Sequence, residues 1–372
     1  MTTASLPPEE VEGLDETPAV EQVSAYPLDD VMVRSETRTV GDIVKRIEAG
    51  RYSMNPDFQR DFVWRPDKQS KLIESCVMRI PLPVLYVAEG EDGRITVVDG
   101  LQRLSTFQVF LNNKLRLTGL GKSHPLEGRR FNDLPINLQE RVEDTQLTLY
   151  ILDKNAPEAA RLDIFDRVNS GIPLSRQQMR NALYNGKATR WLAQMADEAQ
   201  FLSVTGGSLS RLTMRDREAI NRFLSFYTID WRNYNTGDID TFLGQSLSDL
   251  NRQDNERIAY LSGVFLASMR RNEMLFGRHA FRKSLVETTS DERAAAAYRS
   301  VINISLFDVL AVFFVSIGDR DILENGDAIR TNIIALLANE RFTHSITYST
   351  NSTLQVQTRF RMMSEALSEW LP

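Results

Sequence analysis

The chain has 372 residues, of which 42% are hydrophobic and 25% are charged, as in an ordinary globular protein of two or three domains. Its apolar runs fall well short of the roughly 18 residues that a membrane span requires, so we expect no membrane association. The N-terminus lacks the pattern of a secretory signal. A single cysteine, Cys76, excludes an internal disulfide and a cysteine-based zinc site. We therefore expect a protein of the reducing cytoplasm.

The net charge of −6 is concentrated near the N-terminus. Residues 1–33 hold eight acidic residues and four prolines but no lysine or arginine, which leaves 44 basic and 42 acidic residues in the rest of the chain. This composition predicts a disordered acidic leader over 1–33. The near-neutral remainder argues against a broad electrostatic grip on nucleic acid, so any DNA contact is expected to be local.

Residues 34–155 alternate between helical and strand patterns, which predicts an α/β unit. Pro66 is placed to begin one helix, and Gly50 to end another. The expected elements are helices over 39–49, 66–79 and 102–112 and strands over 82–88, 94–98 and 146–152. We expect the strand over 94–98 to be central in the sheet.

Residues 156–372 follow the 3.6-residue period of helices and show no strong strand signal. Ser175 and Gln178 have the spacing of a capping box at the start of a helix. The expected helices cover 158–169, 175–185, 187–200, 214–230, 239–275, 291–317, 327–339 and 352–370. The fold class predicted is therefore α+β, with an α/β unit at 34–155 followed by a larger all-helical domain at 156–372.

A strand, a tight turn and a helix follow one another over residues 95–107. The strand ends in Asp99, Gly100 permits a sharp turn, and the helix start then offers unpaired N–H groups and a positive dipole end. Arg103 is able to add a forked donor to a phosphate, and Asp99 to hold a metal ion or to orient Arg103. Further polar groups in this helix are Gln102, Ser105 and Thr106. The alternative interpretation is an ordinary strand–helix corner with a solvated arginine.

Two further stretches combine arginines with amides. Residues 55–66 place Gln59 and Arg60 among aromatic side chains, a pattern that suits base stacking and phosphate contact or, alternatively, an aromatic anchor for a loop. In the other stretch, Arg167 and Asn169 end one predicted helix. Asn181 lies in the middle of the next helix, where asparagine is unfavourable unless it has a hydrogen-bonding task, which is either functional or structural.

Together the three stretches resemble the N-terminal domain family of the GmrSD-type modification-dependent restriction enzymes. That family has an early Tyr/Phe-Gln-Arg with a following Trp, then Asp-Gly-Gln-Gln-Arg, then Phe-x-Arg-x-Asn-x-Gly with a downstream Arg-Asn-Ala. Here these motifs stand as Phe58-Gln59-Arg60 with Trp64, Asp99-Gly100-Leu101-Gln102-Arg103, Phe165 to Gly171, and Arg180-Asn181-Ala182. The likeness in order and spacing runs from about residue 35 to 190, and the helical remainder looks similar to single-domain members.

The resemblance implies a ParB/sulfiredoxin-like fold for residues 34–155, in which the strand–turn–helix motif binds an NTP, with Mg²⁺ at Asp99. It implies catalytic roles for Asp99, Gln102 and Arg103, and nucleotide contacts from Gln59, Arg60, Gly100, Arg103, Ser105, Thr106, Arg167 and Asn169. Polar groups with forked geometry are costly to bury singly, so we expect seven of them to converge on one cleft: Gln59, Arg60, Asp99, Gln102, Arg103, Arg167 and Asn169. Two positions depart from the family pattern. Leu101 replaces a glutamine, which weakens the case for hydrolysis more than that for binding, and Gln178 replaces a glutamate.

In related defence proteins, nucleotide hydrolysis is coupled to a C-terminal His-Asn-His nuclease domain. None of the three histidines here, His124, His279 and His344, has the context of such a site. A separate nuclease subunit is therefore an expected partner. A basic stretch offers a candidate DNA contact, a solvated face or an oligomer contact, and its cations are Arg270, Arg271, Arg278, Arg282 and Lys283.

Three functions fit these observations. The first is a nucleotide-binding sensor or NTPase component of a bacterial restriction or phage-defence system. The second is a non-catalytic module that binds modified DNA or a partner protein. The third is a metal-dependent nuclease on the ParB-like scaffold, with Asp57, Asp99 and Asp61 as metal ligands. The sequence ranks them in this order. It does not specify the nucleotide, the DNA modification or the oligomeric state.

Overall fold

The computed structural model describes residues 11–13, 33–54, 64–90, 93–153, 161–164, 167, 174–287 and 299–371. The chain divides into two compact units. One comprises Tyr26–Leu183, and the other comprises Met1–Ala25 together with Tyr184–Pro372. The division lies later in the chain than the change of pattern near residue 155, because the helix that precedes Tyr184 packs with the sheet.

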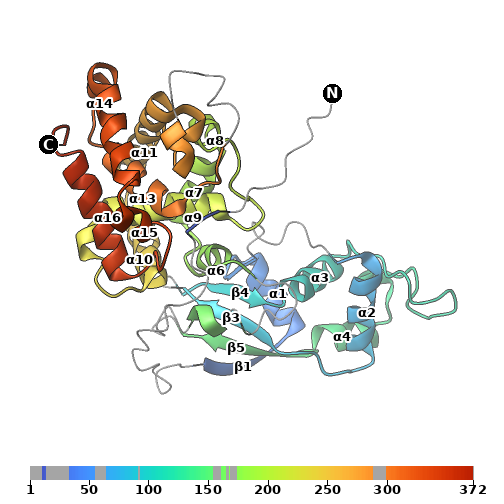
Figure 1. The fold of residues 1–372 in the computed structure, drawn as a ribbon. Coiled ribbons are helices and arrows are strands. Elements are labelled where there is room, and N and C mark those ends of the chain that lie inside the picture. The colour runs from blue at the N-terminus through green and yellow to red at the C-terminus, as the bar shows by residue number, and fades with distance from the viewer. Residues whose placement is uncertain are drawn as a thin grey trace, which may run out of the picture. The chain divides into compact units, whose positions relative to one another are not determined.

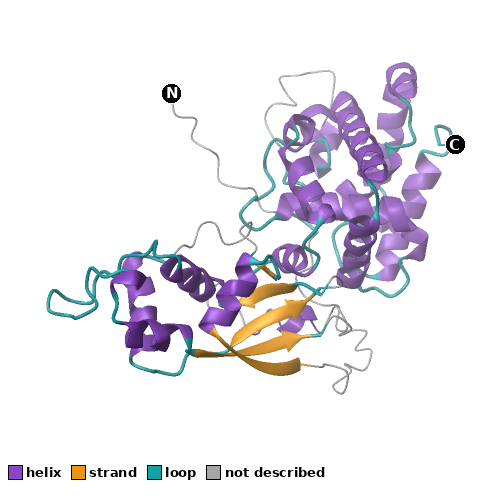
Figure 2. Ribbon diagram, turned by 180° about the vertical axis from the view of Figure 1, so that it is seen from behind, coloured by secondary structure: helices purple, strands orange, loops and turns teal. Residues whose placement is uncertain are grey.

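The first unit is built on a mixed five-stranded sheet (Figures 1 and 2). Its strands are β1 (Val33–Thr39), β2 (Tyr52–Ser53), β3 (Leu85–Glu89), β4 (Ile95–Asp99) and β5 (Gln146–Leu152), in the order β1-β5-β3-β4-β2. Strand β3 occupies the middle, with β5 parallel on one side and β4 antiparallel on the other. The prediction that residues 94–98 form a central strand is confirmed in that β4 is an interior strand, although β3 is the middle one. Strand β4 lies between β3 and the very short β2.

Helices beside the sheet share one hydrophobic core with it (Figure 1). They are α1 (Val40–Glu48), α2 (Pro66–Val77), α3 (Leu101–Leu111) and α4 (Ile136–Glu143). Helix α1 starts where predicted because the Thr39 side chain accepts a hydrogen bond from the Asp42 N–H. Ile43, Ile73 and Phe107 bring α1, α2 and α3 to a common core with the sheet, and each is at most 1% exposed.

A further helix, α6 (Arg176–Leu183), packs against β4. Its predicted capping box is confirmed. The Ser175 N–H donates to Gln178 Oε1 at 2.7 Å, and the Gln178 N–H donates to Ser175 Oγ at 3.2 Å. These reciprocal bonds satisfy two backbone donors at the helix start. They also give Gln178 a local task that does not require the carboxylate of the family pattern.

The second unit is helical, and no strand element follows Leu152 in the described part of the chain. Its helices are α7 (Lys187–Asp197), α8 (Ala199–Thr205), α9 (Arg215–Ser225), α10 (Ile239–Arg252), α11 (Asn255–Phe276), α13 (Ile304–Phe313), α14 (Asp319–Leu337), α15 (Glu340–Ser345) and α16 (Thr353–Ala366). The predicted α+β class is thus confirmed. The helix expected over 239–275 is divided because Gln253 is extended and the Asp254 side chain begins α11 by capping the Arg257 N–H. No described helix has the length and apolarity needed to cross a membrane.

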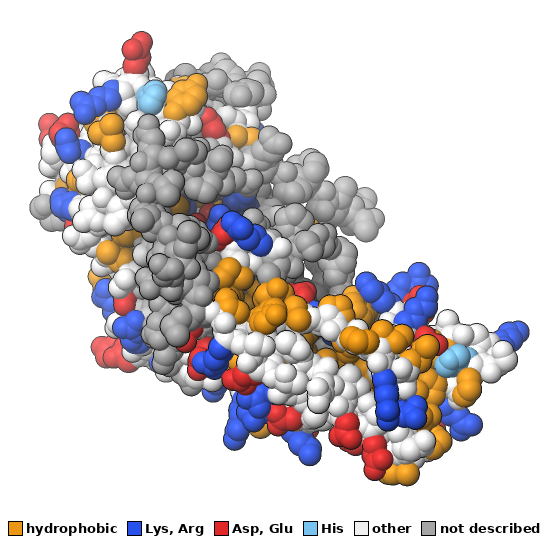
Figure 3. Space-filling model, turned by 90° about the horizontal axis from the view of Figure 1, so that it is seen from below, with side chains coloured by type: hydrophobic (Ala, Val, Ile, Leu, Met, Phe, Trp, Pro, Cys, Tyr) orange, Lys and Arg blue, Asp and Glu red, His pale blue; other side chains and the backbone are white. Residues whose placement is uncertain are grey.

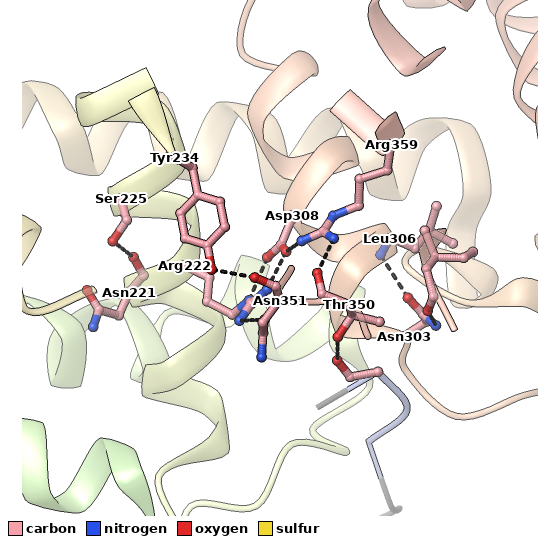
Figure 4. Close-up of polar contacts among 12 residues, drawn as sticks. Asn221, Arg222, Ser225, Tyr234, Asn303, Leu306, Asp308, Thr350, Asn351 and Arg359 are labelled. Atoms are coloured by element: carbon pink, nitrogen blue, oxygen red, sulfur yellow. Dashed lines mark hydrogen bonds and ion pairs between the residues drawn. The ribbon is translucent and has the colours of Figure 1, made fainter. Parts of the chain in front are cut away.

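An ionic cluster lies inside the helical unit and joins α9, α13 and α16 (Figure 4). Both guanidinium nitrogens Nε and Nη2 of Arg222 donate to Asp308, at 2.8 and 2.6 Å. Arg359 donates to the same carboxylate at 2.9 Å. All three side chains are at most 1% exposed. Burial lowers the pKa of Arg359 to about 10 despite its contact with Asp308.

A short N-terminal piece, residues 11–13, joins the same unit. The Glu12 N–H donates to the Ile302 carbonyl and the Ile304 N–H to the Glu12 carbonyl, both at 2.9 Å. The Lys283 ammonium pairs with the Glu12 carboxylate, and Thr350 Oγ1 donates to the Gly13 carbonyl at 2.6 Å. These three residues of the predicted leader therefore have fixed partners. The rest of 1–32 lies outside the described residues.

Candidate functional site

The turn between β4 and α3 requires glycine for two reasons. Gly100 has φ +99°, in the left-handed region that side chains rarely adopt. A Cβ at this position would lie 2.1 Å from Leu85 Cδ2, much closer than any real contact. The backbone therefore turns sharply between the Asp99 carboxylate and the first turn of α3, where three N–H groups have no partner within the helix.

Arg103 is directed into the protein at this turn. Its side chain is 10% exposed, and its guanidinium donates to the Pro83 carbonyl, to the Val84 carbonyl at 3.0 Å and to Asp99 Oδ2 at 2.8 Å. Burial lowers its pKa, and the Asp99 carboxylate opposes that effect. Arg103 thus fastens the segment before β3 to the turn after β4. The forked donor expected from the sequence is present. Its described hydrogen bonds all go to protein oxygen atoms, so Asp99 orients Arg103, as the sequence allowed.

Asp99 is the charged group that the turn leaves accessible. Its side chain is 39% exposed. Only Oδ2 is engaged by Arg103, and among the described residues Oδ1 accepts no hydrogen bond. No group of three or more His, Cys, Asp or Glu side chains within the described ranges is placed to hold a metal ion. Asp99 therefore offers a single carboxylate rather than a cage of protein ligands.

Gln102 connects the turn with the motif that precedes α2. Its Oε1 accepts a hydrogen bond from the Trp64 N–H at 3.0 Å, across 38 positions of sequence. The segment that ends at Trp64 carries Gln59 and Arg60, so this bond brings the end of that segment to the first turn of α3. Gln59 and Arg60 themselves, like Asp57 and Asp61, lie outside the described residues.

The two hydroxyls expected to contact nucleotide differ in exposure. Thr106 is fully buried, and its Oγ1 donates to the Gln102 carbonyl one turn earlier at 2.7 Å. That hydroxyl serves the helix and does not face a ligand. Ser105 is half-buried. The interpretation of Thr106 as a phosphate donor is therefore corrected, because its hydroxyl hydrogen is donated within the helix and its side chain is fully buried.

The third motif forms a buried amide network on α6. Arg180 Nε donates to Gln177 Oε1 at 3.0 Å, and Gln177 Nε2 donates to Asn181 Oδ1 at 2.9 Å. All three residues are at most 1% exposed. The hydrogen-bonding task expected of Asn181 is confirmed. Gln177 was not anticipated, although a glutamine with arginine and asparagine three and four positions later is a readable helical pattern.

The other residues predicted to contact the nucleotide make no described hydrogen bond to the Asp99–Gly100 turn. Arg167 has a side chain that is 75% exposed and forms an ion pair with Asp163 at 2.9 Å, one helical turn away. Asn169 lies outside the described residues. Of the predicted set, Asp99, Gly100, Gln102 and Arg103 lie together at one turn because they are close in sequence, and a hydrogen bond joins Asp99 to Arg103.

Most of the cations in the basic stretch form ion pairs or hydrogen bonds within the helical unit. Arg271 donates to Asp319 and to the carbonyls of Phe314 and Val315, and Arg270 also pairs with Asp319. Arg282 is fully buried and donates to the Ser300 and Thr205 carbonyls. Lys283 pairs with Glu12. The DNA-binding interpretation is thus corrected for Arg282, which has no exposed surface, while Arg278 remains exposed.

Charge on the molecular surface is mixed on the face drawn in Figure 3, where basic and acidic side chains are interspersed with apolar ones. This pattern agrees with the near-neutral charge of the sequence after residue 33. Among the described residues on this face, it gives no single-sign field of the kind that holds a nucleic-acid backbone over a long contact.

Residues 40–185 match the family described as GmrSD restriction endonuclease, N-terminal domain. This segment is a GmrSD N-terminal domain. It begins at α1 and ends just after α6, so it contains β4, the Asp99–Gly100 turn and the buried network of α6. No curated protein matches the chain. The GmrSD N-terminal domain coincides closely with the first compact unit, apart from strand β1.

Proposed function

We propose that this protein is the nucleotide-binding component of a bacterial restriction or phage-defence system, and that the GmrSD N-terminal domain holds an NTP at the Asp99–Gly100 turn. The restriction context comes from the domain family. The nucleotide assignment is carried by one observation. The left-handed Gly100 sets a half-exposed carboxylate beside the free N–H groups of a helix start.

The proposed contacts differ in part from those expected from sequence. The N–H groups of Leu101, Gln102 and Arg103 are the phosphate donors, because the first turn of α3 leaves them without helical partners. Arg103 is a positioning residue, since its described hydrogen bonds hold Asp99 and two carbonyls. Its charge still lies near the turn and favours an anion there.

A magnesium ion suits the single carboxylate of this turn. Mg²⁺ is commonly bound by one or two carboxylates together with phosphate oxygens and water, rather than by a complete protein cage. Asp99 has one oxygen directed by Arg103 and the other without a described partner. In this proposal Asp99 therefore holds Mg²⁺ when the nucleotide brings the remaining oxygens. Leu101 adds no polar group at its position, which favours binding with slow turnover over rapid hydrolysis.

A separate subunit is the proposed source of the nuclease. Each of the three histidines contacts a described side chain that gives it a structural role. His124 Nε2 lies 3.0 Å from Glu74, His279 Nδ1 lies 3.0 Å from Ser284 Oγ, and His344 contacts the ring of Tyr348. Among the described residues none of them joins carboxylates in a metal-binding group. A His-Asn-His centre needs such a group.

Calorimetric titration of the full chain with the four common NTPs, with and without Mg²⁺, tests the proposal. Asp99→Asn keeps the shape of the side chain and is expected to lose Mg²⁺-dependent affinity. Asp144→Asn is the matched control, because Asp144 is an exposed carboxylate in the same unit whose side chain has no partner among the described residues. Folded wild-type protein that takes up none of the NTPs would instead favour a non-catalytic module for DNA or a partner protein.

A further inference from the structure

One face of helix α11 is not covered by the described part of the helical unit. Helices α8, α13 and α14 contact α11 on its other sides (Figure 1). Gly263, at the centre of the open face, is exposed, and Tyr260 beside it is 51% exposed. The α11 face consists of exposed and half-buried residues, namely Glu256, Ala259, Tyr260, Gly263, Leu266, Ala267 and Arg270.

The helical unit itself does not require a glycine at position 263. Gly263 lies within the 22-residue helix Asn255–Phe276, where glycine is less favourable than alanine by about 1 kcal/mol. A Cβ at this position would meet no described atom within 4 Å, whereas a Cβ at Gly326 of α14 would lie 3.2 Å from the Leu275 side chain. An exposed glycine in an open helix face suits the close approach of a helix from another molecule.

The α11 face is symmetrical about Gly263. Glu256 precedes Gly263 by seven residues, and Arg270 follows it by seven. Residues seven apart differ by about 20° around a helix, so these three lie nearly on one line along α11. Tyr260 and Leu266 lie three residues to either side of Gly263. The centre of the face is therefore apolar, and its two ends carry opposite charges.

Both end charges are accessible to a partner. Glu256 is exposed, and its side chain has no partner among the described residues. The Arg270 side chain is 51% exposed and shares the Asp319 carboxylate with Arg271. Its described bond uses Nη2 alone, and a guanidinium group carries five N–H donors. Arg270 can therefore hold a second carboxylate without leaving Asp319.

We propose that the α11 face docks a second copy of this chain, with the two α11 helices antiparallel about a twofold axis at Gly263. In such an interface residue i meets residue j, and j meets i. Positions equally far from Gly263 then face each other, so Glu256 of each copy meets Arg270 of the other. A parallel pair would instead oppose like charges at both ends, which is unfavourable. An unrelated partner would not need this symmetry.

The dimensions of packed helices agree with a contact at Gly263. Helix axes pack about 8–10 Å apart, and each Cα lies about 2.3 Å from its axis. The two Gly263 Cα atoms would then be roughly 3.5–5.5 Å apart, which leaves no room for a long side chain between the helices. From Glu256 to Arg270 the face is about 21 Å long. Such a contact is small, so we expect a dissociation constant of about 1–100 µM.

Sedimentation velocity of the full chain from about 1 to 200 µM tests the association. The wild type is expected to pass from monomer to dimer over this range. Gly263→Gln, which favours the helix but fills the gap between the two copies, should weaken the association by about tenfold or more. Ala328→Gln, at an exposed position of α14, is the matched control and should leave it unchanged. Circular dichroism checks that both variants are folded.

Charge reversal tests the antiparallel orientation. Glu256→Arg places two arginines against each other at both ends of the interface and should weaken the association by about tenfold or more. The double variant Glu256→Arg with Arg270→Glu restores opposite charges in the antiparallel pair, so it should associate more tightly than Glu256→Arg alone. In a parallel pair the double variant would still oppose like charges.

A cysteine at the axis tests the geometry directly. Two copies of Gly263→Cys would bring their thiols together, because the Cα atoms of a disulfide lie about 4.4–6.8 Å apart. Mild oxidation should then give a covalent dimer on a non-reducing gel, whereas Ala328→Cys should stay monomeric. The native thiol of Cys76 is fully buried and does not compete.

Three results would overturn the proposal. They are wild-type protein that remains monomeric up to about 200 µM, association that Gly263→Gln leaves intact, and association that Glu256→Arg weakens but the double variant does not restore. None of these measurements involves a nucleotide. Their outcome is therefore independent of the NTP titration that tests the proposed function.

Discussion

Arg103 lies one helical turn after Asp99 and donates to its carboxylate at 2.8 Å, while the same guanidinium holds the carbonyls of Pro83 and Val84. The arginine of the Asp-Gly-Leu-Gln-Arg motif therefore joins the segment before β3 to the turn after β4. This arrangement directs one oxygen of Asp99 toward Arg103, while the other oxygen has no partner among the described residues.

Replacement of Arg103 by alanine should reduce stability more than a surface charge change does. It leaves two carbonyls and a carboxylate without their donor. A hydrogen bond to a charged group contributes about 1.5–3 kcal/mol, and losses from one shared donor add only in part. We expect a loss of about 2–4 kcal/mol in the free energy of unfolding, measured by urea titration. Arg116→Ala, at an exposed position, should change it by less than about 0.5 kcal/mol. Equal effects of the two substitutions would show that Arg103 faces solvent.

The sequence was sufficient to predict the elements with strong local signals. The strand over Gln146–Leu152 and the capping box of Ser175 and Gln178 are found as predicted. Strand β1 was missed because it alternates charged and hydroxyl residues, and its pairing along the whole length of β5 depends on residues more than 100 positions away. Local periodicity contains no information about such a partner.

The candidate site was predictable in location but not in the direction of its side chains. The motif placed Asp99 and Gly100 at a strand–helix turn, and the structure has them there. Arg103 and Arg282 look the same in sequence as exposed arginines, yet their bonds go to carbonyls that become neighbours only after folding. The parallel pairing of β2 with β4, which sets Tyr52 opposite Ile95, was not predictable either, because it joins segments that are distant in sequence.

Gly100→Ala should destabilise the first unit through two separate effects. The left-handed backbone costs about 1–2 kcal/mol for a residue with a side chain, and the new Cβ would lie 2.1 Å from Leu85 Cδ2. Gly121→Ala is the matched control, because Gly121 has φ +109° but nothing within 4 Å of the new Cβ. We expect about 1–2 kcal/mol for Gly121→Ala and about 3–5 kcal/mol for Gly100→Ala in urea unfolding. Similar losses would mean that Leu85 moves aside freely.

The buried thiol of Cys76 should make stability depend on alkaline pH. Burial raises its pKa to about 11 from 9.0, so the folded protein keeps the thiol proton through a range in which the unfolded chain loses it. The stabilisation is complete below about pH 9 and is lost as pH rises through about 11, and it amounts to about 2–3 kcal/mol at 1.36 kcal/mol per pKa unit. The difference between wild type and Cys76→Ala, measured from pH 8 to 11, isolates it from other groups. A difference that does not change with pH would contradict the prediction. So would labelling of the native thiol by a thiol reagent at pH 8.

The buried cluster of the helical unit should respond unequally to loss of its anion and loss of one cation. Asp308 is the carboxylate that both Arg222 and Arg359 contact, and all three are enclosed. Asp308→Asn keeps the volume but leaves two buried guanidinium groups without a counterion, which should cost about 3–5 kcal/mol.

Arg359→Met is the comparison, because it leaves the two-bond pair of Arg222 with Asp308 intact. It also removes the arginine whose pKa burial lowers to about 10 and whose Nε is buried with no described partner. An apolar side chain of similar length can fill such a place at little cost, so we expect a loss of less than about 2 kcal/mol. Urea unfolding followed by tryptophan fluorescence reports on this unit, since Trp191, Trp231 and Trp370 belong to it. An equal loss of unfolding free energy for Arg359→Met and Asp308→Asn would contradict the prediction. It would show that Arg359 stabilises the cluster as much as the shared carboxylate does.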